Sequence, residues 1–211
     1  YSKALDANKK NIFKKEIVPI SLVDRKGNNI LIEKDEEPYR AKLDRISQLK
    51  AAFSPEGTIT AANASKLNDG AAVLLVTNES TAENLGIKPL AKIIAHASVA
   101  HEPQWFTSAP GKAITKVLAK AKISIEKIDL WEINEAFAAV TMAVMDDFEI
   151  PSGNVNIYGG AVALGHPIGA SGSRILTTLL NGMKNRNVKY GLATLCIGGG
   201  EASALIVENY E

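Results

Sequence analysis

The sequence predicts an α/β fold in which a mostly parallel sheet lies between layers of helices. From about residue 67 onward, short apolar runs typical of buried strands alternate with amphipathic helical patterns. Such alternation favours parallel strands joined by helical crossovers. The chain then ends in two apolar runs separated only by the glycine-rich residues 197–201, which favours a final antiparallel pair.

The first 66 residues have a different texture, with short elements joined by polar segments. In chain order, we expect a mostly polar helix over 1–15, a hairpin of strands 16–24 and 28–35, a short helix over 43–49 and a loop over 55–70. Pro19 limits the first strand to a sheet edge or a bulge because it cannot donate a ladder hydrogen bond.

The remaining elements alternate in type. The expected strands are 71–77, 90–100, 127–133, 189–196 and 202–210. The expected helices are a short one between Ser80 and Gly86, one opened by Pro110, one over 134–148 and one over 173–183. The run 71–77 is continuously apolar, which predicts a strand covered on both faces.

Composition excludes several classes of partner. A net charge of +1 over 211 residues gives no bulk field that would attract nucleic acid or an acidic membrane. No apolar run approaches the roughly 18 residues of a membrane span, and no secretory signal is visible. Cys196 is the single cysteine, so it forms no internal disulfide, which fits a reducing compartment. We therefore expect a protein that is not secreted and binds neither nucleic acid nor membranes.

Three chemically capable residues follow predicted strands. Asn134 directly follows the strand 127–133, His166 follows the run VNIYGG (155–160) within the glycine-rich stretch 159–174, and Cys196 ends the strand 189–196. Ligands of open α/β sheets gather at the carboxyl ends of the strands. We expect these three side chains to converge.

His166 lies between Gly165 and Gly169, just before a helix expected to begin near residues 170–171. Glycine lets a ligand approach the backbone, and a helix N-terminus favours developing negative charge. An imidazole there can bind an oxyanion or accept a thiol proton. The alternative is a structural histidine that bonds a turn carbonyl.

Cys196 and Asn134 also have structural alternatives. A lone cysteine on a buried strand is often a small apolar residue, but the glycines at 198–200 bring backbone N–H groups close to the sulfur. Asn134 followed by Glu135 suits a helix N-cap, whereas its functional interpretation is an amide that orients a water or donates to an oxyanion.

Several motifs together resemble the thiolase family. They are NEAFA (134–138), GGAVALGHPIGASGSR (159–174), CIGGG (196–200), NASKLNDGAA (63–72), EIVPI (16–20) and KDEEP (34–38). The last two are similar to the acetoacetyl-CoA branch of the family. The resemblance implies a thiolase-like layered α/β/α fold, with a mixed five-stranded sheet in the C-terminal domain. It divides the chain into the C-terminal part of the loop domain (1–66), the last strand and helix of the N-terminal domain (67–88) and the C-terminal domain (89–211).

The resemblance also implies a reaction, the condensation of two acetyl-CoA to acetoacetyl-CoA and CoA, or the reverse thiolysis. His166 matches the family's histidine that activates a nucleophilic cysteine and helps hold the thioester oxygen. Asn134 matches the asparagine that positions a water in the same oxyanion hole. Cys196 matches the acid/base cysteine that moves the α-proton of acetyl-CoA, and Gly198 matches the N–H donor of the second oxyanion hole. No cofactor is required beyond the coenzyme A thioesters that serve as substrates.

Substrate-binding positions follow in the same way. Ser65, Phe53 and Phe137 match residues that line the CoA tunnel, and Phe106 falls where the family places an acyl-pocket side chain. Lys66 departs from the many relatives that have glycine there. The segment AANAS (61–65) and Val162 are similar to potassium-using thiolases, which implies a K⁺ site near Ala61, Ala62, Ala64 and Val162.

One expected group is absent from these 211 residues. The family's nucleophilic cysteine lies upstream, in an N-terminal half that the resemblance assigns to a missing segment. We therefore expect the isolated chain to be inactive, and expect a homodimer or homotetramer in the cytoplasm or the mitochondrial matrix. The alternatives are a longer-chain 3-ketoacyl-CoA thiolase and a non-catalytic relative that binds CoA or lipid.

Overall fold

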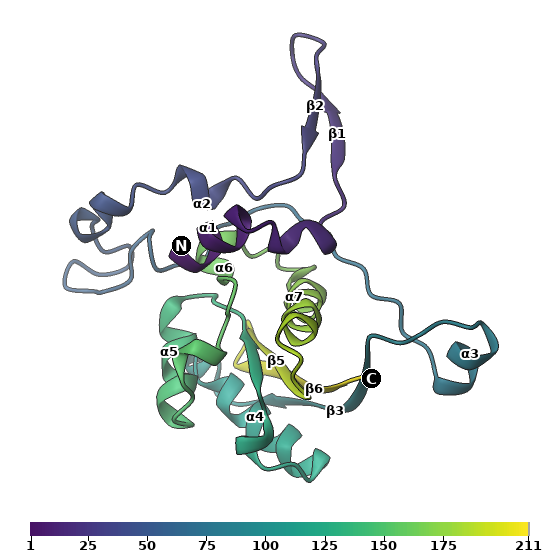
Figure 1. Cartoon of the computed structure of the whole chain (residues 1–211). Coiled ribbons are helices and arrows are strands. Elements are labelled where there is room, and N and C mark those ends of the chain that lie inside the picture. Colours follow the sequence, from purple (N-terminus) through teal and green to yellow (C-terminus); the bar gives the residue numbers. More distant parts are fainter. Residues whose placement is uncertain (211) are drawn as a thin grey trace.

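The computed structural model describes residues 1–210 and has an α/β architecture with a mixed sheet. Its helices are α1 (Ser2–Lys9), α2 (Glu37–Arg40), α3 (Glu79–Asn84), α4 (Ala109–Ala121), α5 (Ala138–Asp147), α6 (Ala161–Leu164) and α7 (Ser171–Arg186). Its strands are β1 (Ile20–Val23), β2 (Asn29–Ile32), β3 (Ala91–Ala100), β4 (Leu130–Ile133), β5 (Tyr190–Ile197) and β6 (Glu201–Asn209). Short 3₁₀ turns include 12–15, 43–48, 103–105, 125–127 and 152–154. The chain is shown in Figure 1.

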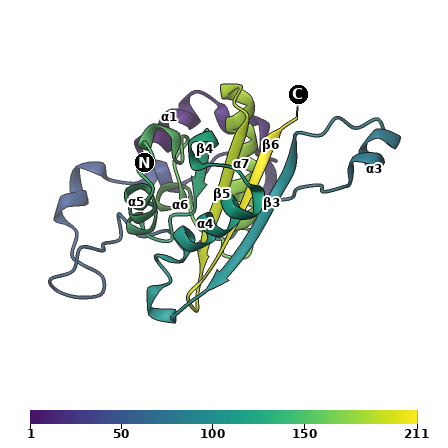
Figure 2. The same cartoon turned by 90° about the horizontal axis from the view of Figure 1, so that it is seen from below.

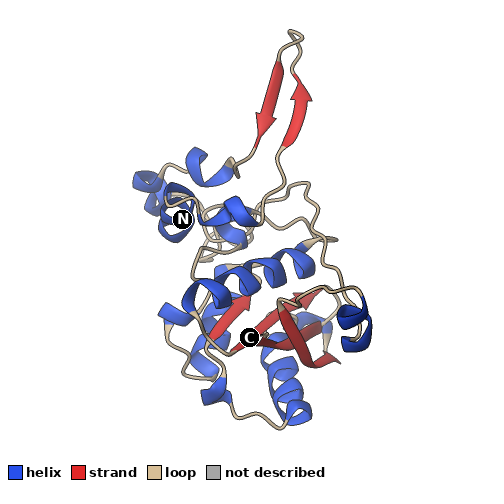
Figure 3. Cartoon of the chain, turned by 45° about the vertical axis from the view of Figure 1, so that its right-hand side comes forward, coloured by secondary structure: helices blue, strands red, loops and turns tan. Residues whose placement is uncertain are grey.

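The main sheet lies between two helical layers, as the sequence predicts (Figure 3). Its strand order is β3-β6-β5-β4; β4 and β5 are parallel, and β6 runs antiparallel to both of its neighbours. Successive residues of a strand point to opposite faces. Accordingly Trp131 packs in the cluster that contains α4 and α5, whereas Leu130 packs in the cluster that contains α7.

Within residues 1–210 the main sheet has four strands, not the five that we expected. Val155 makes a single parallel bridge to Trp131 at the outer side of β4, where a fifth strand would lie. Asn156 follows with φ 45°, a left-handed conformation that ends the extended run after one residue. Its side chain, rather than a continued ladder, then bonds the backbone of Ile133.

The apolar run 71–77 is not the doubly covered strand that we expected. It forms no strand within residues 1–210, and Val73 is 90% exposed. The run leads to α3, which Figure 2 shows beyond the β3 edge and away from the helical layers. A strand needs neighbours for its backbone groups and side chains, and no described strand lies beside this run.

The hairpin prediction is confirmed. β1 and β2 pair in register from Ile20↔Ile32 to Val23↔Asn29 and project from the body (Figure 1). The Asp24 carboxylate accepts hydrogen bonds from the turn, including the Lys26 N–H at 2.8 Å.

Three helix predictions need correction. The helix expected over 1–15 ends at Lys9, because Asn11 adopts a left-handed φ of 55°, and residues 12–15 form a separate 3₁₀ turn. Residues 43–48 form a 3₁₀ turn rather than an α-helix. The helix expected from Asn134 begins only at Ala138, because Phe137 is held extended by backbone hydrogen bonds between residues 136–138 and the 63–65 segment. None of the helices within residues 1–210 is both long and apolar enough to cross a membrane.

Candidate active site

The residue before His166, Gly165, has a backbone conformation that any other residue would adopt only with strain. Gly165 ends α6 with φ 100° and ψ 163°. A Cβ at this position would overlap the side chain of Asn68. The His166 N–H then donates to the Lys66 carbonyl at 3.0 Å, which fixes the histidine to the 61–66 loop.

The imidazole of His166 is held at both ring nitrogens. Its Nδ1 lies 2.6 Å from Ser171 Oγ, and its Nε2 lies 3.3 Å from Asn134 Nδ2. Ser171 Oγ also lies 3.1 Å from the Pro167 carbonyl, which can only accept, and we assign the single hydroxyl proton to this contact. Ser171 Oγ is therefore an acceptor toward the ring, so Nδ1 carries the proton and Nε2 presents a lone pair.

This tautomer is the one a base needs. Partial burial lowers the pKa of the His166 imidazole, and the positive charge of Arg174 lowers the pKa further. The ring is therefore neutral near pH 7, with Nε2 available to accept a proton. Ser171 begins α7, as the sequence predicts for a helix near residues 170–171.

Asn134 joins the histidine to the sheet. Its N–H donates to the Thr194 carbonyl at 2.9 Å, which continues the β4–β5 ladder by one residue. The side chain is 1% exposed, and its Oδ1 has no hydrogen-bond partner within residues 1–210. Asn134 does not cap α5, whose N-cap is Phe137, so the structural alternative for this residue is wrong.

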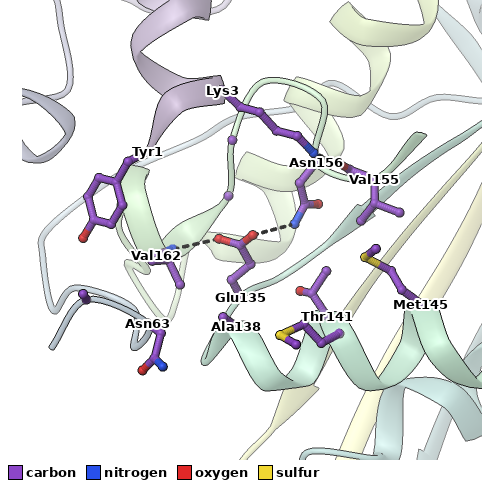
Figure 4. A pocket seen from close by; sticks show the side chains of 14 residues that line it. Tyr1, Lys3, Asn63, Glu135, Ala138, Thr141, Met145, Val155, Asn156 and Val162 are labelled. Carbon is purple, nitrogen blue, oxygen red and sulfur yellow. Dashed lines mark hydrogen bonds between the residues drawn. The ribbon is translucent and has the colours of Figure 1, made fainter. Parts of the chain in front are cut away.

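Two residues that the sequence interpretation missed hold Asn134 from both sides. Asn156 accepts from the Ile133 N–H at 2.8 Å and donates to the Ile133 carbonyl at 2.9 Å. Its amide also donates to Glu135 Oε1 at 3.2 Å, and Glu135 Oε2 accepts from the Val162 N–H at 3.0 Å. Figure 4 shows this chain of contacts beside a cavity of about 240 Å³. A Cβ on Gly160 would overlap the Glu135 carboxylate. In the sequence, this glycine is the one feature that could have indicated the position of the Glu135 side chain.

Cys196 lies on the same edge of the sheet. Ile133 and Thr194 are partners on adjacent parallel strands, so Asn134 and Cys196 both lie at carboxyl ends. Cys196 is buried and pairs across the ladder with Ala202. Burial raises the pKa of its thiol, so the sulfur is protonated near pH 7 and needs a partner base to ionise.

The turn after Cys196 requires glycine. Gly199 and Gly200 have φ of 97° and 87°, and a Cβ on Gly200 would overlap the backbone of His101 and Glu102. The Gly200 carbonyl accepts from the His101 N–H at 2.9 Å. Gly198, the predicted N–H donor, lies at the start of this turn, directly after β5.

The predicted substrate-binding residues gather around Phe137. The Phe53 and Phe106 ring centroids lie 6.0 Å and 6.4 Å from that of Phe137. The Ser65 N–H donates to the Ala136 carbonyl at 3.0 Å, in a short antiparallel contact between the two segments. The four positions that the sequence assigned to substrate therefore lie near one another, although their contact with a substrate stays a prediction.

Arg174, whose charge acts on His166, is paired with a buried carboxyl group. Arg174 Nη1 is 3.7 Å from Glu132 Oε2, and both side chains are largely buried. Burial raises the pKa of Glu132 to about 8, although Arg174 opposes the rise. Burial likewise raises the pKa of Glu16 to about 7. Within residues 1–210, no group of three or more His, Cys, Asp or Glu side chains could hold a metal ion.

Comparison with known proteins identifies the family. A model of the thiolase C-terminal domain matches residues 87–209, and a model of the thiolase N-terminal domain matches residues 1–80. The chain belongs to the thiolase family. Its main sheet with helices on both faces is thus the thiolase layered fold, with four described strands in place of the expected five.

Named relatives of this thiolase chain include acetyl-CoA acetyltransferases. A probable acetyl-CoA acetyltransferase of Dictyostelium discoideum is 49% identical over 208 residues, which cover 99% of this chain and 50% of the relative. The crystal structure of the Bacillus anthracis acetyl-CoA acetyltransferase is 41% identical with a TM-score of 0.94, covering 99% of this chain and 53% of that one. An Ascaris suum thiolase solved in complex with coenzyme A is 38% identical with a TM-score of 0.87, at 99% and 53% coverage. The chain thus spans about half the length of the relatives it matches.

Proposed function

We propose that the protein carrying this sequence is an acetyl-CoA C-acetyltransferase, which condenses two acetyl-CoA to acetoacetyl-CoA and CoA and catalyses the reverse thiolysis. The observation that carries the proposal is the Ser171–His166–Asn134 contact chain, anchored one residue past the strand pair that bears Cys196. The acetyl-CoA acetyltransferases among the relatives support the substrate.

Each residue has a role that its contacts support. The Nε2 lone pair of His166, which faces the Asn134 amide, accepts a thiol proton from the nucleophile, and the N–H so formed then donates to the thioester oxygen. Asn134 Oδ1 is a buried acceptor with no partner within residues 1–210, which suits a water held at the oxyanion hole. Cys196 first gives its thiol proton to the CoA sulfur that leaves when the acyl group moves to the nucleophile, and the thiolate so formed then takes the α-proton of the incoming acetyl-CoA. The N–H of Gly198 stabilises the enolate oxygen; one such donor is worth about 10²–10³ in rate.

The bond changes balance without a cofactor. The enolate carbon attacks the acyl carbon of the enzyme thioester, the new C–C bond forms, and the C–S bond to the nucleophile breaks. The released thiolate recovers its proton through the ring of His166. Since Cys196 is the only cysteine of this chain and is buried on β5, we assign the acyl-carrying thiol to a residue outside these 211 residues.

Coenzyme A thioesters fit the remaining geometry. We assign the pantetheine to the surface of Phe53, Phe137 and Ser65, and the acyl group to the neighbourhood of Phe106. The Ascaris thiolase solved with coenzyme A supports this class of ligand. We also propose a homodimer or homotetramer in the cytoplasm or the mitochondrial matrix; the free thiol of Cys196 supports a reducing compartment.

A single substitution tests the proposal in the complete protein. His166→Ala should reduce thiolysis of acetoacetyl-CoA by about 10²–10⁴ while CoA binding, followed by calorimetry, is retained. His96→Ala is the matched control, because His96 is exposed on β3, remote from the glycine-rich loop. Equal thiolysis in the two variants would remove His166 from the reaction. Preference for longer 3-ketoacyl chains over acetoacetyl-CoA would favour a 3-ketoacyl-CoA thiolase instead, and CoA binding without turnover a non-catalytic relative.

A further inference from the structure

The side chain of Lys66 binds the carbonyl groups of its own loop. Its ammonium donates to the Ala61 carbonyl and, at 3.3 Å, to the Ala64 carbonyl. The same Nζ lies 5.7 Å from the centroid of the Tyr1 ring, within reach of a cation–π interaction. One positive charge therefore satisfies two loop carbonyls and faces an aromatic ring.

Both carbonyl groups belong to residues near which we expected a potassium ion. Of Ala61, Ala62, Ala64 and Val162, the first and third already have a cationic partner in Lys66. Backbone carbonyls bind K⁺ by replacing its hydration shell. A second cation on the same oxygens would meet the repulsion of a full positive charge at hydrogen-bond range. The residues present therefore do not fit a K⁺ ion together with Lys66.

The loop that Lys66 closes supports the candidate active site. The Lys66 carbonyl accepts from the His166 N–H at 3.0 Å, and the adjacent Ser65 N–H donates to the Ala136 carbonyl at 3.0 Å. The segment thus bonds the backbone of the histidine on one side and the segment after Asn134 on the other. Movement of residues 61–66 would be passed directly to the imidazole.

We propose that Lys66 is a positioning residue that supplies, from within the chain, the positive charge for which the 61–64 carbonyl groups would otherwise require a monovalent cation. The protein then orders this loop without K⁺. The inference concerns the same site as the proposed acetyltransferase activity and uses that activity as one of two readouts.

The test compares cation dependence in the complete protein. Lys66→Met removes the charge and keeps most of the aliphatic stem, so the carbonyl groups become available to an added ion. Wild-type thiolysis should be the same in KCl and NaCl at equal ionic strength. Lys66→Met should lose about 10-fold in NaCl, the equivalent of one charge-assisted hydrogen bond, and recover most of it in KCl. Lys50→Met is the control, because Lys50 is exposed in the preceding segment and makes no hydrogen bond or ion pair within residues 1–210.

Thermal unfolding gives a readout that does not depend on turnover. An ion that binds only the folded state raises Tm, so KCl should raise the Tm of Lys66→Met above its value in NaCl and leave wild type and Lys50→Met unchanged. Wild type activated by K⁺, a Lys66→Met variant with the same activity and Tm in both salts, or a loss that K⁺ does not restore would each overturn the inference. Absence of wild-type turnover would instead count against the proposed function, and the Tm comparison would still decide the role of Lys66.

Discussion

The Ser171 hydroxyl is the group through which the tautomer of His166 can be tested. It accepts from Nδ1 at 2.6 Å and donates to the Pro167 carbonyl at 3.1 Å. Ser171→Ala leaves both partners without the hydroxyl, and the ring can then carry its proton on either nitrogen. An unmade hydrogen bond of a buried group costs about 1–3 kcal/mol. Because the ring is half-buried and water can reach part of it, we expect the lower half of this range, which corresponds to a fall in kcat/KM of about 5- to 30-fold.

The assay is acetoacetyl-CoA thiolysis by the complete protein, followed by the loss of substrate absorbance. Ser173→Ala is the matched control: it removes the same atom two residues later in α7, where the hydroxyl makes no hydrogen bond within residues 1–210. The loss should fall mainly on kcat, because the substitution changes the base and leaves the Phe53–Phe137 surface intact. Equal kcat/KM for the two variants would refute the assignment of the proton to Nδ1.

Further predictions concern the supports of the site. Gly165→Ala should lower Tm by several degrees, because φ 100° costs about 1–3 kcal/mol for alanine; Gly172→Ala, in open space on α7, should not lower it. Glu132 keeps its proton up to about pH 8 when folded but releases it near 4.5 when unfolded, so its contribution to stability is complete below 4.5 and is lost as pH rises through 8. Glu132→Gln should flatten this fall in urea unfolding midpoints across that range. Asn156→Ala should destabilise by about 2–5 kcal/mol in the same urea assay, since it removes three hydrogen bonds from a left-handed residue.

Elements with a local signal were predicted well from the sequence. The apolar period of α4 buries Ile114 and Val117, and the apolar run of β5 buries Leu192, each as the pattern indicates. Run 71–77 has an equally apolar pattern and yet is exposed, because a run of side chains does not specify which strand will pair with it. Similarly, residues 134–137 have a helical pattern but lie outside α5, since Phe137 is extended and pairs with Ala64 from more than seventy residues earlier.

The residues of the candidate site likewise fall into those with a local signal in the sequence and those without one. Asn134, His166 and Cys196 could be proposed from the sequence because Asn134 and Cys196 stand at the ends of predicted strands and His166 stands among glycines before a helix start. Their supports were not identifiable: Asn156 acts on residues flanking position 134, and Lys66 acts on the backbone of position 166. Hydrogen bonds that join residues so distant in sequence leave no periodic signal, and only the glycines that make room for them can be recognised beforehand.

The Ser171 hydroxyl sets the direction of hydrogen-bond donation along the contacts from Ser171 through His166 to Asn134. With the Ser171 proton assigned to the Pro167 carbonyl, the hydroxyl receives a proton from Nδ1 of His166, and Nε2 is then an acceptor. Asn134 therefore has to present its NH₂ group to the ring, which leaves Oδ1 as the free acceptor. A proton donor such as water is thus the ligand that completes Asn134, whereas a carbonyl oxygen is suited to the Nε2 side only after His166 has taken a proton. The order of events in the proposed reaction follows from this polarity: the ring must first accept the thiol proton before it can stabilise an oxyanion.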